Sequence, residues 1–99
     1  MKIGNLFEID GCLVRLGKIG HVHRGTMKTF EFNVIAGTET VGGRDYGPEL
    51  HRGLQGFGVN YFWSQGYVED SKRLKKAKDP LLYVGMTYKT QEYLELLKG

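Results

Sequence analysis

The chain has 99 residues, including 15 glycines, two prolines and one cysteine, and its 14 lysines and arginines exceed its 11 acidic residues. This length fits one domain, and a content of 40% hydrophobic and 12% aromatic residues excludes a disordered segment. The glycines follow no Gly-X-Y period, so we expect them to serve bends and turns of an ordered fold. Composition therefore limits the fold and the surface chemistry without identifying an activity.

The single cysteine, Cys12, excludes an intramolecular disulfide and a cysteine-based zinc site. We expect it to be a small apolar residue of a strand. The N-terminal residues have no apolar stretch of the signal-peptide kind, and no apolar run approaches the ~20 residues of a membrane-spanning helix. These features predict a cytoplasmic protein that has no membrane partner.

The first part of the chain has the pattern of β-strands. Residues 6–9 and 12–16 are short extended runs, and the Asp10-Gly11 pair between them predicts a hairpin turn because both residues tolerate positive φ. Residues 29–36 alternate apolar with polar side chains, which predicts a strand that has one face in the core.

Glycines interrupt the next part of the chain. Gly17 and Gly20 predict a bulge or bend in the strand that contains them. Residues 37–58 contain seven glycines, and within them a proline followed by an acid predicts one or two turns of helix over residues 47–57.

The C-terminal part mixes strand and helix patterns. The aromatic run 59–63 predicts a strand, residues 67–78 predict a helix with early acids and late cations, and residues 81–88 predict a buried strand. Thr90 is then the expected cap of a final helix over residues 91–98. The predicted fold is α+β: one compact domain over residues 1–99, with a mainly antiparallel twisted sheet and two or three short helices toward the C-terminal half.

The basic charge is concentrated in residues 72–78, which contain five cations and no acid. The rest of the chain has nine cations and eleven acids, a net charge of −2. Such a cluster is either a solvated face of a helix or an electrostatic footprint for phosphates. The candidate contact residues are Lys72, Arg73, Lys75, Lys76 and Lys78.

Three aromatic residues near this cluster are further candidates. Tyr61, Trp63 and Tyr67 would form a stacking platform for bases if they were exposed beside the basic helix. The alternative, which we favour for Trp63, is that they belong to the core. A fourth candidate, Arg44, follows two glycines whose backbone could form a nest for an anion.

No set of residues indicates catalysis or metal binding. His21 and His23 have a spacing that some zinc sites use, but the sequence supplies no third ligand beside them. Residues 82–87 with the helix that follows resemble the second signature of the GIY-YIG nuclease family. That family has an arginine on this helix, and residues 86–99 contain none, so no catalytic residue is carried over. We expect no enzymatic activity, no metal and no cofactor.

The sequence therefore predicts a small non-enzymatic binding or regulatory protein. In the first hypothesis it contacts nucleic acid, or a nucleoprotein complex, through the basic helix. In the alternative it is a protein-binding regulator or inhibitor, of the compact accessory kind that phages encode, which acts through its glycine-rich loops and an aromatic surface. An exposed strand edge would allow a homodimer in either case.

Overall fold

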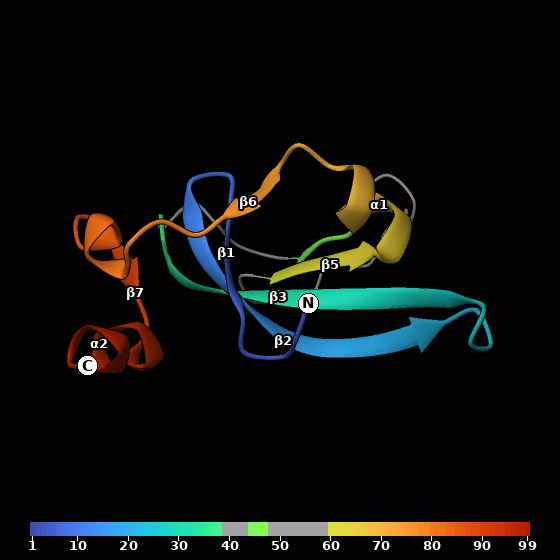
Figure 1. Ribbon diagram of the computed structural model, residues 1–99, viewed down its shortest axis with the longest axis horizontal. Coiled ribbons are helices and arrows are strands. Elements are labelled where there is room, and N and C mark those ends of the chain that lie inside the picture. The colour runs from blue at the N-terminus through green and yellow to red at the C-terminus, as the bar shows by residue number, and fades with distance from the viewer. Residues whose placement is uncertain (39–43, 48–59) are drawn as a thin grey trace.

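The computed structural model describes residues 1–38, 44–47 and 60–99 (Figure 1). Its strands form one sheet in the order β4-β5-β3-β2-β1-β6, and β7 pairs with β3 beside this path. The strands are β1 (Leu6–Ile9), β2 (Cys12–Val22), β3 (Met27–Gly37), β4 (Arg44–Asp45), β5 (Asn60–Ser64), β6 (Leu74–Lys76) and β7 (Tyr88–Lys89). The helices are α1 (Gln65–Asp70), the 3₁₀ helix η1 (Pro80–Tyr83) and α2 (Gln91–Leu97).

The β1–β2 hairpin turns as its sequence predicts. Asp10 and Gly11 have φ values of 52° and 81°, the left-handed backbone that a two-residue hairpin turn needs. The predicted irregularity in β2 is also present, because the β2–β3 register shifts between Leu16 and Lys18. Gly17 lies at this shift, where a Cβ atom would overlap the side-chain amide of Asn33.

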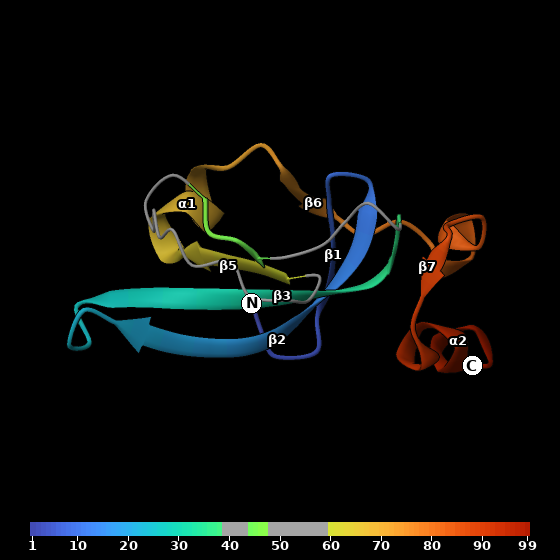
Figure 2. The ribbon, with the colours of Figure 1, turned by 180° about the vertical axis from the view of Figure 1, so that it is seen from behind.

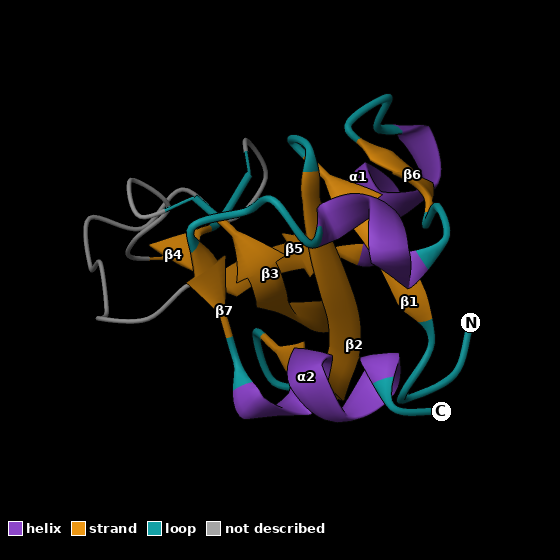
Figure 3. Cartoon of the chain, turned by 90° about the vertical axis from the view of Figure 1, so that its left-hand side faces the viewer, coloured by secondary structure: helices purple, strands orange, loops and turns teal. Residues whose placement is uncertain are grey.

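Both faces of the sheet are buried in part. On the face over which β4 and β6 approach each other, the larger cluster of buried hydrophobic side chains forms around Phe32 and Trp63. On the opposite face, η1 and α2 cover a smaller cluster, and Figure 3 shows α2 packed against the strands there. Figures 1 and 2 show η1 and α2 at one end of the long axis and the β2–β3 turn at the other. The second cluster comprises Leu13, Ile35, Ala36, Tyr83 and Tyr93.

The α+β class is confirmed, with a mixed rather than purely antiparallel sheet. The β4–β5 pair is parallel, with Arg44 opposite Asn60, whereas the other pairs among the described strands are antiparallel. The described ranges contain two α-helices, one of them C-terminal. The predicted helical turns over residues 47–57 lie, apart from Gly47, outside the described residues. None of the helices described has the length and apolar character to cross a membrane.

The predicted helix over residues 67–78 is wrong beyond its first turn. α1 ends at Asp70, Ser71 is extended, and residues 74–76 form strand β6, which pairs with β1. Only Leu74 and Ala77 are apolar between residues 69 and 79, so a helix there would have no apolar stripe. In the strand, Leu74 lies opposite Ile9 and packs against the core. The backbone of β6 also pairs with the outer edge of β1.

The predicted strand over residues 81–88 is also wrong for most of its length. Residues 80–83 form η1, whose first turn is capped by Asp79: its carboxylate accepts a hydrogen bond from the amide of Leu81 at 2.9 Å. Only Tyr88 of this run lies in a strand, the short β7. The final helix is confirmed as α2, with the Thr90 hydroxyl accepting from the amide of Tyr93 at 3.3 Å.

Candidate functional site

The basic segment 72–78 lies along one edge of the sheet rather than on a helix. β6 is the last strand in the sheet order, so one side of its backbone has no neighbouring strand among the described residues. Lys75 lies opposite Glu8 and Lys76 lies opposite Phe7 in the antiparallel register. Because successive strand residues point to opposite faces, these two lysines flank the edge on both sides.

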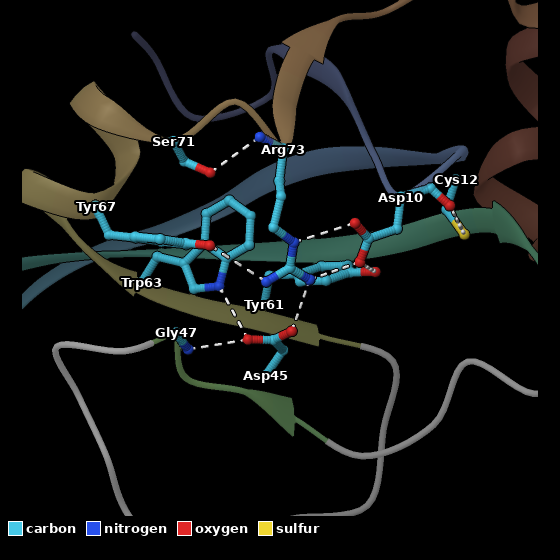
Figure 4. Close-up of polar contacts among 9 residues, drawn as sticks. All are labelled: Asp10, Cys12, Asp45, Gly47, Tyr61, Trp63, Tyr67, Ser71 and Arg73. Carbon is cyan, nitrogen blue, oxygen red and sulfur yellow. Dashed lines mark hydrogen bonds and ion pairs between the residues drawn. The ribbon is translucent and has the colours of Figure 1, made fainter.

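Arg73, directly before β6, binds two carboxylates at once (Figure 4). Its Nε and Nη2 donate to the Oδ1 and Oδ2 of Asp10 at 3.1 and 2.6 Å, and Nη2 also donates to the Oδ2 of Asp45 at 2.7 Å. A fourth donation goes from Nη1 to the hydroxyl of Tyr67 at 3.4 Å. The guanidinium therefore uses most of its donors within the protein.

Aromatic rings enclose the same guanidinium. Its central carbon lies 5.0 Å from the centroid of Trp63 and 5.8 Å from that of Tyr61, within the range of cation–π attraction. Trp63 is fully buried and Tyr61 is 5% exposed, so the favoured interpretation of Trp63 as a core residue is confirmed. The faces of these two rings contact the protein itself, and in this structure they are not exposed for stacking with bases.

The Arg73 cluster, defined as Asp10, Asp45, Tyr61, Trp63, Tyr67 and Arg73, joins the two ends of the sheet. Asp45 belongs to β4, the first strand in the sheet order, and Arg73 immediately precedes β6, the last. The ion pair between them therefore spans the opening between the two edges of the curled sheet. Gly47 also contacts this cluster with φ of +67°, and a Cβ atom there would lie 3.1 Å from the Tyr67 ring.

The environment of the cluster shifts the pKa values of its groups. Burial by itself would raise the pKa of Asp45, but hydrogen bonds from Arg73, the Gly47 amide and the Trp63 indole outweigh it and lower that pKa. Burial and the nearby Asp10 carboxylate raise the pKa of Tyr61, whose hydroxyl donates to that carboxylate at 3.3 Å. The hydrogen bond to Asp10, and then that to Asp45, raise the pKa of Arg73 against the opposing effect of burial. The cluster thus holds a fixed cation and an ionised Asp45 at neutral pH.

The lysines of the segment have fewer partners. Lys78 lies 3.7 Å from the buried Glu8 carboxylate, which also accepts a 2.7 Å hydrogen bond from the hydroxyl of Tyr83. The remaining three, Lys72, Lys75 and Lys76, are exposed and form no ion pair within the described part of the chain. We call these three residues the β6 lysines, although Lys72 lies two residues before the strand.

Arg44 is engaged elsewhere. Its guanidinium pairs with Glu31 at 3.4 Å and lies 5.6 Å from the ring centroid of Phe62. Arg44 and Asp45 are successive residues of β4, so their side chains point to opposite faces, and only Asp45 joins the Arg73 cluster. The predicted backbone nest at residues 42–43 lies outside the described residues.

The groups suited to nucleophilic or metal chemistry are dispersed in the described ranges. Cys12 is buried, and burial raises the pKa of its thiol. His21 and His23 are exposed near the β2–β3 turn. Among the residues that the structure describes, no three histidine, cysteine or acidic side chains come together in a way that could hold a metal ion.

Sequence reasoning missed two features of this surface. Asp10 and Asp45 lie 63 and 28 residues from Arg73 in the chain, and no local pattern links them. Leu81 and Leu82 of the short helix η1 and its C-cap Val84 are exposed, at 62%, 68% and 55%. A signal for that helix was present, because aspartate followed by proline is a common helix start.

Comparison with protein families, with curated proteins and with solved structures gives no match for this chain.

Proposed function

We propose that the protein is a small non-enzymatic binding protein that contacts nucleic acid, alone or within a nucleoprotein complex, through the β6 lysines. The observation that carries this proposal is the presence of three exposed lysines, without ion pairs in the described part of the chain, on the edge strand β6 and just before it. Lysine side chains bind phosphates as point charges and release condensed counterions, which favours binding to a polyanion.

The arrangement supports backbone contact rather than sequence reading. Lys75 and Lys76 flank the edge on both faces, so a phosphate chain that follows β6 would meet cations on either side. Lysine contacts to phosphate fix position but carry no sequence information. Lysines on an edge strand also prevent unwanted pairing with other strands, and a binding experiment separates this role from the proposed one.

The test compares two double variants that each remove two positive charges. Lys75→Gln/Lys76→Gln changes the β6 lysines, and Lys2→Gln/Lys98→Gln changes two exposed lysines elsewhere on the chain. Fluorescence anisotropy of a labelled oligonucleotide at ~50 mM salt, where phosphate contacts are strongest, measures the affinity. We expect the β6 variant to lose about tenfold or more in affinity and the control to lose about threefold or less.

Two results would overturn the proposal. The first is that the wild-type protein does not bind any oligonucleotide at this low salt concentration. The second is an equal loss of affinity in both double variants, which would show that only the overall charge matters.

One observation favours the alternative, a protein-binding regulator. η1 and its C-cap Val84 expose three large apolar side chains, and exposed apolar groups of this kind mark protein contacts. This alternative predicts a partner that remains bound after nuclease treatment and is lost in Leu82→Ser. Loss of the partner on nuclease digestion would contradict it.

A further inference from the structure

The β2–β3 hairpin extends beyond the strands that flank it. Among the described residues, β5 pairs with β3 only as far as Thr29, and β1 pairs with β2 only between Cys12 and Arg15. Residues 20–29, which we call the arm, form the end of this hairpin. Within it, residues 21–22 pair with residues 27–28 as a two-stranded ribbon that ends in the turn 23–26. Figures 1 and 2 show this turn at the end of the long axis opposite α2.

The arm is basic and carries no acid. Residues 20–29 contain one arginine, one lysine, two histidines and no aspartate or glutamate. Arg24 is exposed at the turn, and Lys28 is half-buried directly opposite His21 in the register. Neither Arg24 nor Lys28 forms an ion pair with any residue that the structure describes.

The turn holds basic residues in a backbone conformation that disfavours them. His23, Arg24 and Gly25 have successive φ values of 53°, 58° and 85°. The amide of Gly25 donates to the carbonyl of Val22 at 3.2 Å, which closes the turn around His23 and Arg24. Asparagine, aspartate and glycine are the residues favoured at such positions. Strain of this kind at non-glycine residues points to a function for their side chains.

We propose that the arm enters the major groove of B-form duplex DNA. This inference rests on the proposed nucleic-acid binding and names the form of nucleic acid. A two-stranded β-ribbon fits the major groove, which is about 12 Å wide. Two strand residues, His21 and Val22, lie between Gly20 and the turn and extend about 7 Å, close to the groove depth of about 8.5 Å. The deep, narrow major groove of A-form RNA does not admit such a ribbon.

The side chains of the arm suit this groove. Arg24 at the apex has the fork of donors that matches the O6 and N7 acceptors of guanine. Lys28 lies further back on the ribbon, with its ammonium 5.4 Å from the ring centroid of Phe30, and would supply a cation for the phosphates that line the groove. The arm thus combines one group for base edges with one for the backbone.

The experiment compares three double variants that each remove two charges. They are the arm variant Arg24→Gln/Lys28→Gln, the β6 variant Lys75→Gln/Lys76→Gln and the control Lys2→Gln/Lys98→Gln. The probes are a labelled DNA duplex of mixed sequence and a single strand of the same length. We expect the arm variant to lose about tenfold or more in duplex affinity and about threefold or less in single-strand affinity. Wild-type protein should also protect guanine N7 in the duplex from dimethyl sulfate.

The outcomes separate this inference from the proposed function. Unchanged duplex affinity in the arm variant, together with weaker binding in the β6 variant, would overturn the proposed role of the arm and support that of the β6 lysines. An equal loss on both probes would show that the arm adds only charge, and would also overturn the inference. If neither probe binds the wild-type protein, both proposals are wrong.

A single substitution tests the strained turn itself. Arg24→Asn places a residue that tolerates left-handed backbone at the apex and removes the guanidinium. We expect a higher Tm than wild type and weaker duplex binding, because the strain and the function belong to the same residue. A higher Tm with unchanged duplex affinity would show that the turn is only structural.

Discussion

Two groups of cations in the same seven-residue segment have opposite environments. Arg73 binds two carboxylates and two aromatic rings and joins the opposite edges of the sheet. The β6 lysines, a few residues away, are exposed and form no ion pair with the described residues. The difference shows that a charge cluster in a sequence can contain both a structural cation and surface cations. A substitution at the first should change stability, and one at the second should change binding.

The largest effect on stability is expected from Arg73→Met. This change leaves Asp10 and Asp45 close together without their shared cation, and loss of hydrogen bonds to charged groups costs about 2–3 kcal/mol here. For a chain of this size the loss lowers Tm by roughly 10–20 °C, measured by thermal unfolding. The matched control Lys75→Met should stay within about 0.5 kcal/mol of wild type. Equal stability of the two variants would remove the distinction between the two groups.

A smaller effect is expected from Asp45→Asn, and it should depend on pH. The Asp45 carboxylate is 36% exposed, so we expect its loss to cost only about 1 kcal/mol at pH 7, measured by urea unfolding. Because the pKa of Asp45 is lowered in the folded state, its contribution is present above about pH 4, the ordinary value of an aspartate, and is lost as the pH falls further. The stabilities of wild type and variant should therefore converge below about pH 4. A constant difference between pH 7 and pH 3 would contradict this ion pair.

The smallest effect in the cluster is expected from Tyr67→Phe. Its hydroxyl accepts a long hydrogen bond of 3.4 Å from Arg73, while its ring packs edge-on against Trp63. Removing only the hydroxyl should cost about 0.5 kcal/mol in urea unfolding. A loss as large as that of Arg73→Met would mean that the tyrosine, and not the two carboxylates, positions the guanidinium.

The sequence predicted those elements that depend on local patterns. Asp10-Gly11 specified its turn through backbone preference, residues 29–36 specified a strand through alternation, and Thr90 specified a helix start through capping. These signals depend on residues close together in the chain, so the structures that they predict are present in the fold.

The sequence failed where distant residues decide the local structure. The cations after α1 favoured a helix, but pairing with β1 and burial of Leu74 make residues 74–76 a strand. The sequence groups Arg73 with the lysines for the same reason, because its partners Asp10 and Asp45 are distant in the chain. The placement of Trp63 in the core followed correctly from its size and apolar character.

The most direct test of the two groups of cations is the salt dependence of oligonucleotide binding in the triple variant Lys72→Gln/Lys75→Gln/Lys76→Gln. We expect the slope of log K against log salt to decrease in magnitude by roughly 2–3, since each phosphate contact contributes about 0.7–0.9. The free energy of unfolding, measured on the same sample, should remain within about 0.5 kcal/mol of wild type. An unchanged slope, or a loss of stability as large as that of Arg73→Met, would contradict the division between a structural arginine and surface lysines.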